Sequence, residues 1–291
     1  MAVVSSGSPL TARRKLGAEL RILRDRAGLT TEEVGAHLNC HNSKVSRIEL
    51  AKRMCTRKDF AGLMELYEVD DEKRAELTDL MTRAMQRIPP WWQAYADVIS
   101  ANYAEFLAYE AEASRCCEYQ PLLIPGLLQT ADYAHAVTGV SFTALGPDQV
   151  ESLVEVRMRR QERLREGDPI VLEAVVTEAA LHLRVGGTEV MRGQLRHLRQ
   201  VATDNDNVTF RVLPFEAGEK AASTGAFTLF GIGQDSATDV AFTESADNTT
   251  NFRDDPLALR RMSRLFQSLS AAALSEEDSA ELVERIEKEL V

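Results

Sequence analysis

The sequence has few cysteines and no long apolar run. Its 291 residues include four cysteines without a CxxC spacing, so a disulfide framework is not expected. No apolar stretch approaches the roughly 20 residues that a membrane-spanning helix needs. The N-terminus has no basic segment followed by an apolar core, the pattern of a signal peptide. We therefore expect a cytoplasmic protein with no membrane contact.

The sequence also lacks the patterns of a catalytic, metal or cofactor site. There is no nucleophile elbow and no Gly-rich phosphate loop. His37, Cys40 and His41 lie close together, but a fourth ligand at a recognisable spacing is missing. We therefore predict no enzyme activity, no metal and no cofactor, and we interpret Cys40 as an apolar turn residue.

No low-complexity tract is present, and the chain is long enough for two domains that each bury a core. The break falls at Ile88-Pro89-Pro90, where prolines end a helical pattern and Trp91 and Trp92 follow. We predict a disordered tail over residues 1–12, a DNA-binding domain over 13–88 and a second domain over 91–291.

Charge is unevenly distributed along the chain. Residues 1–60 carry 12 basic and 6 acidic residues, a net charge of +6, whereas the remainder carries 22 against 39, a net charge of -17. A basic head on an acidic protein suggests a polyanion partner for the head alone, although a solvated helix face gives the same count. The pattern of residues has to decide between these readings.

Cap residues and helical spacing predict two helices joined by a tight turn near the N-terminus. Apolar residues at helical spacing run through 14–27, and Gly28 supplies a left-handed stop. Thr30 is a good N-cap for the next helix, and Glu33 completes a capping box. Asn39 tolerates left-handed backbone angles and can end that second helix at once.

The segment NSKVSRIEL then predicts a recognition helix. Val45 and Ile48 share an apolar face, while Ser43, Lys44 and Arg47 project from the other face. The second of two such helices lies in the DNA major groove, where its side chains meet base edges and phosphates. The predicted DNA contacts are the polar and basic residues of this region: Thr30, Thr31, Asn42, Ser43, Lys44, Ser46, Arg47, Lys52 and Arg53.

The stretch LRDRAGLTTEEVGAHLNCHNSKVSRIELAKR resembles the Xre-type helix-turn-helix shared with lambda repressor and Cro, and the resemblance covers about residues 14–87. It implies a five-helix domain that binds double-stranded DNA. Thr31, His41 and Ala51 depart from the family pattern. If His41 caps the third helix poorly, Asn42 becomes the cap and does not read bases.

Two further features complete the expected domain. An acid facing phosphate would be repelled, so we expect Glu49 to pair with a basic side chain such as Arg53 or one of the first helix. Apolar stripes after Phe60 and up to Ala84 predict the fourth and fifth helices. One recognition helix contacts too few base pairs for genomic specificity, so we expect a homodimer on half-sites about one helical turn apart.

The second domain reads as α+β, which makes the whole chain mainly α. We expect helices over 97–118, up to Gly139, over 147–166, between the first two strands, and over 256–273 and 276–290. Four β-branched and aromatic segments, IVLEAVVTEAAL, NVTFRVLPF, GAFTLFGI and DVAFTES, predict an antiparallel sheet of about four strands. Glu112 and Arg115, three apart in the first helix, can form a surface ion pair.

This half resembles the uncharacterised domain that follows Xre-type helices in many bacterial regulators, described as the Scr family of antitoxin-like regulators. The stretch EAEASRCCEYQPLLIPGLLQTADYAHAV and the segment VLPFEAG carry the resemblance. It implies a small partner protein and no catalytic residue. The candidate partner or ligand residues are Trp91, Trp92, Glu110, Glu112, Arg115, Tyr119, Gln129 and Tyr133.

Two alternatives remain open at this point. Trp91, Trp92, Tyr95 and Tyr103 can line a pocket for a hydrophobic small molecule, which would make the protein a ligand-responsive regulator. The departures at the head would also fit a partner-binding module that no longer binds DNA.

Overall fold

The computed structural model describes residues 9–51, 53–86, 90–140, 145–219, 224–231, 239–244 and 250–290. The chain divides into two compact units, Met1–Pro90 and Trp91–Val291, here called the first and the second unit. Each unit is described by itself. No helix among the described residues is both long and apolar enough to cross a membrane.

The first unit is helical, as predicted. Its described residues form the helices α1 (Pro9–Arg26), α2 (Thr31–His37), α3 (Asn42–Glu49), α4 (Arg57–Leu66) and α5 (Asp71–Ala84). Helix α1 begins within the segment 1–12 that was predicted to be a tail, because Pro9 pre-sets the backbone angle of a first helical turn. The first eight residues of that segment lie outside the described residues.

One apolar cluster holds the first unit together. Leu16 and Leu20 of α1 pack with Val45 and Ile48 of α3, and Leu77 of α5 lies in the same cluster. All five side chains are at most 3% exposed. The apolar stripes read from the sequence are therefore the faces that meet in the core, and they fix the face that α3 leaves to solvent.

The second unit has more helices than the first. They are α6 (Ala101–Glu112), α7 (Ala131–Gly139), α8 (Pro147–Arg160), α9 (Glu178–His182), α10 (Thr188–Asp204), α12 (Pro256–Ala272) and α13 (Glu276–Glu289). The unit also contains the short 3-10 turns η1 (Trp91–Tyr95), η2 (Gly126–Leu128), η3 (Gln161–Leu164) and η4 (Phe215–Ala217).

The sheet of the second unit is mixed and six-stranded. The strands are β1 (Arg115–Gln120), β2 (Val171–Thr177), β3 (Val208–Leu213), β4 (Phe227–Gly231), β5 (Val240–Glu244) and β6 (Thr250–Arg253), in the order β3-β2-β1-β4-β5-β6. Strand β1 pairs with β2 and β2 with β3 in parallel, because helical crossovers join them; the other pairings are antiparallel.

The prediction of about four antiparallel strands is therefore imprecise, because the described sheet has six strands and three of its five pairings are antiparallel. Strand β1 was read as the end of a helix over 97–118, but the helix ends at Glu112 and Ala113 is already extended. Five consecutive residues of β1, Cys116 to Gln120, are buried, so the strand shows no apolar alternation. It carries Glu118 and Gln120, residues that are rare in buried strands. Strand β6 is short and polar, and it also escaped detection.

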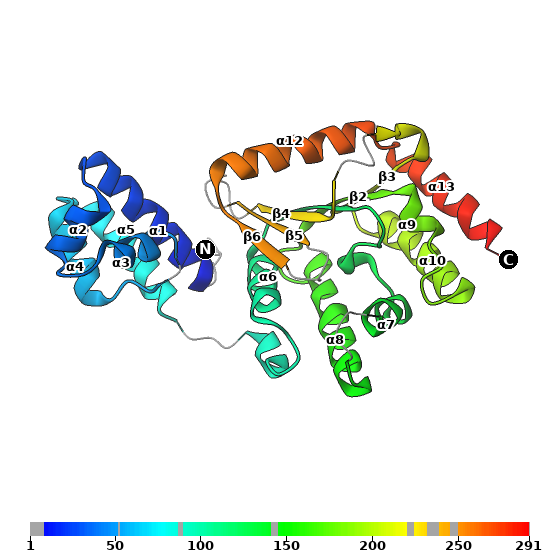
Figure 1. Cartoon of the computed structure of the whole chain (residues 1–291), viewed down its shortest axis with the longest axis horizontal. Coiled ribbons are helices and arrows are strands. Elements are labelled where there is room, and N and C mark those ends of the chain that lie inside the picture. The colour runs from blue at the N-terminus through cyan, green and yellow to red at the C-terminus, as the bar shows by residue number, and fades with distance from the viewer. Residues whose placement is uncertain are drawn as a thin grey trace. The chain divides into compact units, whose positions relative to one another are not determined.

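Helices cover both faces of this sheet. Helix α12 packs on one face, where Phe266 and Leu269 join Cys117, Tyr119 and Phe227 in an apolar cluster. Figure 1 shows α12 along this face and α6 and α8 on the opposite side. There, Phe106 of α6 lies 5.1 Å, centroid to centroid, from both Phe230 and Phe242 of the sheet.

Candidate nucleic-acid interface

The turn between α2 and α3 is built by local hydrogen bonds. Thr30 caps α2: its hydroxyl oxygen accepts from the Glu33 amide at 3.2 Å, and the Thr30 amide donates to the Glu33 carboxylate at 2.7 Å, which confirms the predicted capping box. Asn39 has a left-handed φ of 52°, as predicted. A Cβ on Gly35 would lie 2.8 Å from the carbonyl oxygen of Cys40. Gly35 therefore lets the turn fold back on α2.

His41 is the N-cap of α3. Its Nδ1 accepts from the Ser43 amide at 3.2 Å and lies 2.9 Å from the Ser43 hydroxyl. Of the two caps considered from the sequence, His41 is thus the one used. Asn42 instead donates from its side-chain amide to Glu32 at 2.5 Å. This bond engages the NH2 group and leaves the amide oxygen of Asn42 as an acceptor.

Helix α3 has one buried and one open face. Val45 and Ile48 are 2% and 3% exposed and point into the core. Ser43 and Arg47 are exposed, and Arg47 has no ion pair within the described part of the chain. The open face of α3 therefore presents a hydroxyl and a guanidinium, the groups that contact phosphates and guanine edges.

The other predicted DNA contacts vary in exposure. Thr30 and Arg53 are exposed, whereas Thr31 and Ser46 are half-buried. Lys52 lies outside the described residues. The exposed residues Thr30 and Arg53 precede and follow α3 along the chain. A role in DNA binding stays a prediction for each of them.

Lys44 has a structural partner that the sequence did not reveal. Its ammonium lies 2.7 Å from the carboxylate of Asp59, which is 5% exposed in the first turn of α4. Burial would raise the pKa of Asp59, but hydrogen bonds from Lys44 and Thr56 outweigh it, so the pKa is lowered. Lys44 thus holds α3 against α4, and it is not a free cation.

Glu49 also has the structural role predicted for it. Its carboxylate accepts from the Arg24 guanidinium of α1 at 2.7 Å and 3.1 Å, a two-point contact. Arg24 donates in addition to the carbonyl oxygen of Leu29 at 2.9 Å. The prediction of a basic partner in the first helix is confirmed. The pair ties the end of α3 to α1.

Two basic residues beside α3 were missed. Arg57 and Lys58 open α4, are exposed, and have no ion pair among the residues that the structure describes. The contact between Lys44 and Asp59 brings this first turn of α4 next to α3. The sequence signal that could have indicated them is the group of basic residues Arg53, Arg57 and Lys58 around the Thr-x-x-Asp cap of α4. Its position beside α3 depends on tertiary contacts.

Gly17 was missed as well. A Cβ on Gly17 would lie 2.5 Å from the carbonyl oxygen of Glu49 and 2.8 Å from that of Ile48. Only glycine lets the backbone of α1 approach the end of α3 this closely. Gly17 therefore helps to set the position of α3.

Four of the candidate partner residues lie in the core of the second unit. Glu110, Tyr119, Gln129 and Tyr133 are all at most 3% exposed. The two carboxylate oxygens of Glu110 accept hydrogen bonds from the Arg160 guanidinium, one at 2.8 Å and the other at 2.6 Å. These side chains are held inside the fold, so a partner cannot reach them without a rearrangement.

The loop after β1 explains two of these motif residues. The Gln129 amide donates to the carbonyl oxygen of Ile124 at 2.7 Å, and Arg157 donates to the Gln129 side-chain oxygen at 2.8 Å. The Ile124 amide donates to the Tyr133 hydroxyl at 3.2 Å. The resemblance motif thus marks residues that shape the loop.

Arg115 does not pair with Glu112, because the two are not in one helix. Arg115 begins β1, and its guanidinium lies 2.7 Å from the carboxylate of Glu173, two residues beyond its register partner Val171 in the parallel strand β2. The predicted helix-surface pair is wrong for the same reason that β1 was missed. The Arg115 side chain is 56% exposed.

The aromatic residues near the start of the second unit pack on one another. Trp91 lies 5.6 Å from Trp92 and 6.3 Å from Tyr95, centroid to centroid, and the Arg159 guanidinium lies 4.8 Å from the Trp91 ring. Tyr103 stacks on Phe106 instead, at 6.2 Å. The four aromatic residues predicted to line one pocket therefore belong to two separate groups, Trp91 with Trp92 and Tyr95, and Tyr103 with Phe106.

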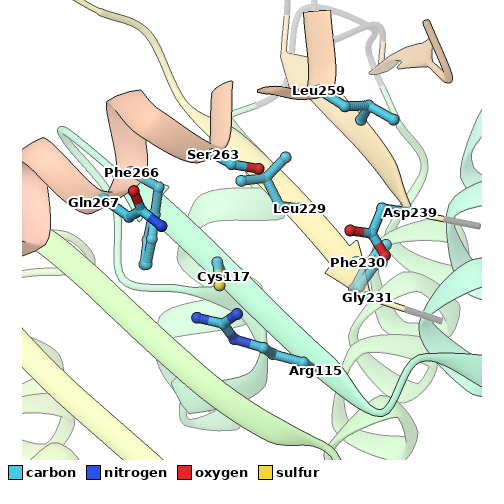
Figure 2. Close-up of a pocket in the computed structure, with 10 residues that line it drawn as sticks. All are labelled: Arg115, Cys117, Leu229, Phe230, Gly231, Asp239, Leu259, Ser263, Phe266 and Gln267. Atoms are coloured by element: carbon cyan, nitrogen blue, oxygen red, sulfur yellow. The ribbon is translucent and has the colours of Figure 1, made fainter. Parts of the chain in front are cut away.

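A small cavity lies elsewhere, between α12 and the sheet. Figure 2 shows Arg115 and Cys117 of β1 on one side and Ser263, Phe266 and Gln267 of α12 on the other. Its volume is about 70 Å³. This holds a few water molecules and is well below the roughly 300 Å³ at which small-molecule pockets begin.

Comparisons with known families agree with this architecture. A family model described as a helix-turn-helix domain matches residues 15–77. The first unit is therefore a helix-turn-helix domain, a class of fold typical of DNA-binding regulators.

A second family model, for a domain of unknown function called DUF5753, matches residues 103–285. This match covers more than half of the chain, and the chain belongs to this family. Neither a curated protein nor a solved structure matches the chain significantly.

Proposed function

We propose that the protein is a sequence-specific transcription regulator of the Xre type, antitoxin-like, that reads the DNA major groove through α3. The observation that carries the proposal is the two-sided character of α3. Val45 and Ile48 anchor it in the core, while Ser43 and Arg47 stay exposed, and Arg47 has no ion pair within the described residues. A helix held rigidly by its back and polar on its front suits base recognition.

Fluorescence anisotropy on labelled DNA from upstream of its own gene, against scrambled DNA, tests the proposal. Over a salt series, the wild-type protein should prefer the upstream DNA, and Arg47→Ala should remove the preference. Arg285→Ala, at an exposed arginine of α13, is the matched control and should keep it. Absence of any preference at every salt concentration, with the helices intact by circular dichroism, would refute the proposal.

We also propose a homodimer, since one recognition helix contacts too few base pairs for specificity in a genome. Sedimentation velocity, with and without DNA, measures the state directly. A dimer in either condition supports two-fold half-site binding. A strict monomer in both conditions contradicts it.

A small partner protein for the second unit is supported by exposed apolar side chains. Phe215 is 58% exposed and stacks on His182, centroid to centroid at 5.7 Å, and Leu122 is 56% exposed. Phe215 follows β3 and Leu122 follows β1, strands of one parallel set, so both lie beyond the same edge of the sheet. Exposed apolar groups at one edge are typical of an interaction surface.

Co-expression with a small protein encoded beside the gene tests the partner. The two should co-elute in size exclusion, and the double variant Leu122→Ser, Phe215→Ser should weaken the complex. Val140→Ser, at a side chain that is 83% exposed, is a matched control. If the double variant and the control bound the small protein equally well, the partner would not bind at this edge of the sheet. The DNA-binding proposal would be unaffected.

A further inference from the structure

Helix α12 has a basic outer face. Its inner residues Leu259 and Phe266 are 9% and 3% exposed and pack on the sheet. Arg260, Arg261 and Arg264 are all exposed. At about 100° per residue, these three arginines fall within an arc of about 100° opposite the inner face. Figure 1 shows the length of α12 along one face of the sheet, which leaves its other side outward.

These arginines differ from most arginines of the second unit. Elsewhere, Arg160 pairs with Glu110, and Arg199 pairs with Glu284 and Glu287. Within the described part of the chain, none of the three α12 arginines forms an ion pair or a side-chain hydrogen bond. Residues 91–291 hold 18 basic and 32 acidic residues, so acidic residues that could pair with these arginines outnumber the basic ones. Arg260, Arg261 and Arg264, which have no acidic partner among the described residues, therefore form a local concentration of positive charge.

We propose that this outer face of α12 binds DNA phosphates and gives the protein a second DNA contact besides α3. The inference rests on the proposed function, because DNA held by the first unit is then at high local concentration for the second unit of the same chain. Arg is suited to this contact, since its guanidinium forms two parallel hydrogen bonds with phosphate oxygens.

The geometry fits a strand of phosphates. Arg260 and Arg264 are separated by about 6 Å along the axis of α12, which is close to two phosphate steps of about 3.4 Å each along the duplex axis. The acidic surface of the unit does not cancel the patch, because the field of exposed charges fades over about 8 Å at physiological salt. The contact carries no base information, so it adds affinity equally to all sequences.

A pair of triple variants tests the inference. Arg260→Gln, Arg261→Gln, Arg264→Gln removes the patch, while Arg165→Gln, Arg184→Gln, Arg285→Gln removes the same charge at other exposed positions without ion pairs among the described residues. Affinity is measured on operator and scrambled duplexes across a salt series. All six side chains are exposed, so both proteins should melt like the wild type.

The α12 triple should bind both duplexes at least about ten-fold more weakly at 0.1 M salt, and its slope of log affinity against log salt should be shallower by up to about 2.7. The control triple should keep the wild-type slope. Equal slopes for the two triples would overturn the inference and leave the proposed function intact, as would loss of dimers by the α12 triple without a change in slope. Absence of DNA binding by the wild-type protein would refute both.

Discussion

At the scale of single residues, Lys44 and Arg47 look alike in sequence but differ in surroundings. Lys44 pairs with the buried Asp59, and Arg47 is exposed. Lys44→Ala should therefore cost about 2 kcal/mol of unfolding free energy, because it leaves a carboxylate buried without its cation. Arg47→Ala should stay within about 0.5 kcal/mol of wild type. Chemical denaturation of both variants checks this.

The double variant Lys44→Ala, Asp59→Asn serves as the control for this prediction. Removing both charges should recover part of the loss, since no charge is then buried alone. If Arg47→Ala destabilised the protein as much as Lys44→Ala, the division into a structural and a DNA-facing cation would be wrong.

Glu118 makes the stability of the second unit depend on pH. Burial raises its pKa from 4.5 to about 7, although Arg160 and a hydrogen bond from Gln120 act in the opposite direction. The folded state then binds the proton more tightly than the unfolded state, so stability falls as pH rises from about 4.5 to 7. Glu118→Gln removes this loss and should stabilise the protein by about 1 to 3 kcal/mol at pH 8.

Melting temperatures of the wild type and of Glu118→Gln between pH 4.5 and 8 measure the effect. The two curves should converge at the acid end and separate at the alkaline end. Parallel curves across the whole range would show that Glu118 does not titrate there.

Residue roles were predictable from the sequence only where they depend on near neighbours or on a simple charge argument. Thr30 forms a capping box with Glu33, which lies three residues further along the chain. Glu49 was expected to pair with a basic residue, because an unpaired carboxylate facing DNA would be repelled by phosphate. The partner of Lys44 lies 15 residues away and on another helix. No local pattern indicates that contact.

At the scale of elements, the close approach of α1 to α3 depends on Gly17. Gly17→Ala places a methyl group 2.5 Å from the Glu49 carbonyl oxygen, where only backbone can give way. We expect a loss of about 1 to 3 kcal/mol, despite the better helix propensity of alanine. Thermal unfolding followed by circular dichroism measures it.

Gly62→Ala in α4 is the matched control in the same unit. Its new methyl group would meet only the tip of the Leu38 side chain, at 2.9 Å, and that tip can move. The change should therefore stay within about 1 kcal/mol. A loss as large as that of Gly17→Ala would contradict the role given to the backbone contact.

The elements of the first unit could be predicted because caps, turns and stripes agree there. The sheet of the second unit could not. Strand β1 contains Arg115 and Gln120, whose partners Glu173 and Glu244 come from distant segments, and the buried Glu118, which accepts a hydrogen bond from Gln120. Its parallel pairing with β2 follows from crossovers of about 50 residues, which a local pattern cannot encode.

At the scale of the whole molecule, charge divides the chain into a basic head and an acidic remainder. The second unit has a net charge of -14 from 18 basic and 32 acidic residues, while the open face of α3 carries Arg47 and has Arg53, Arg57 and Lys58 near it. Bulk charge therefore opposes DNA binding, and local basic surfaces favour it. This division was visible in the sequence, whereas the outer face of α12 required the structure.

Selection of DNA from a random library tests the central claim most directly. The wild-type protein should enrich a two-fold symmetric motif whose half-sites lie about one helical turn apart, near 34 Å. Arg47→Ala should lose at least one conserved position of each half-site, and Arg285→Ala should enrich the wild-type motif. If the folded wild-type protein enriched no motif, or if Arg47→Ala enriched the same motif unchanged, α3 would not be a recognition helix.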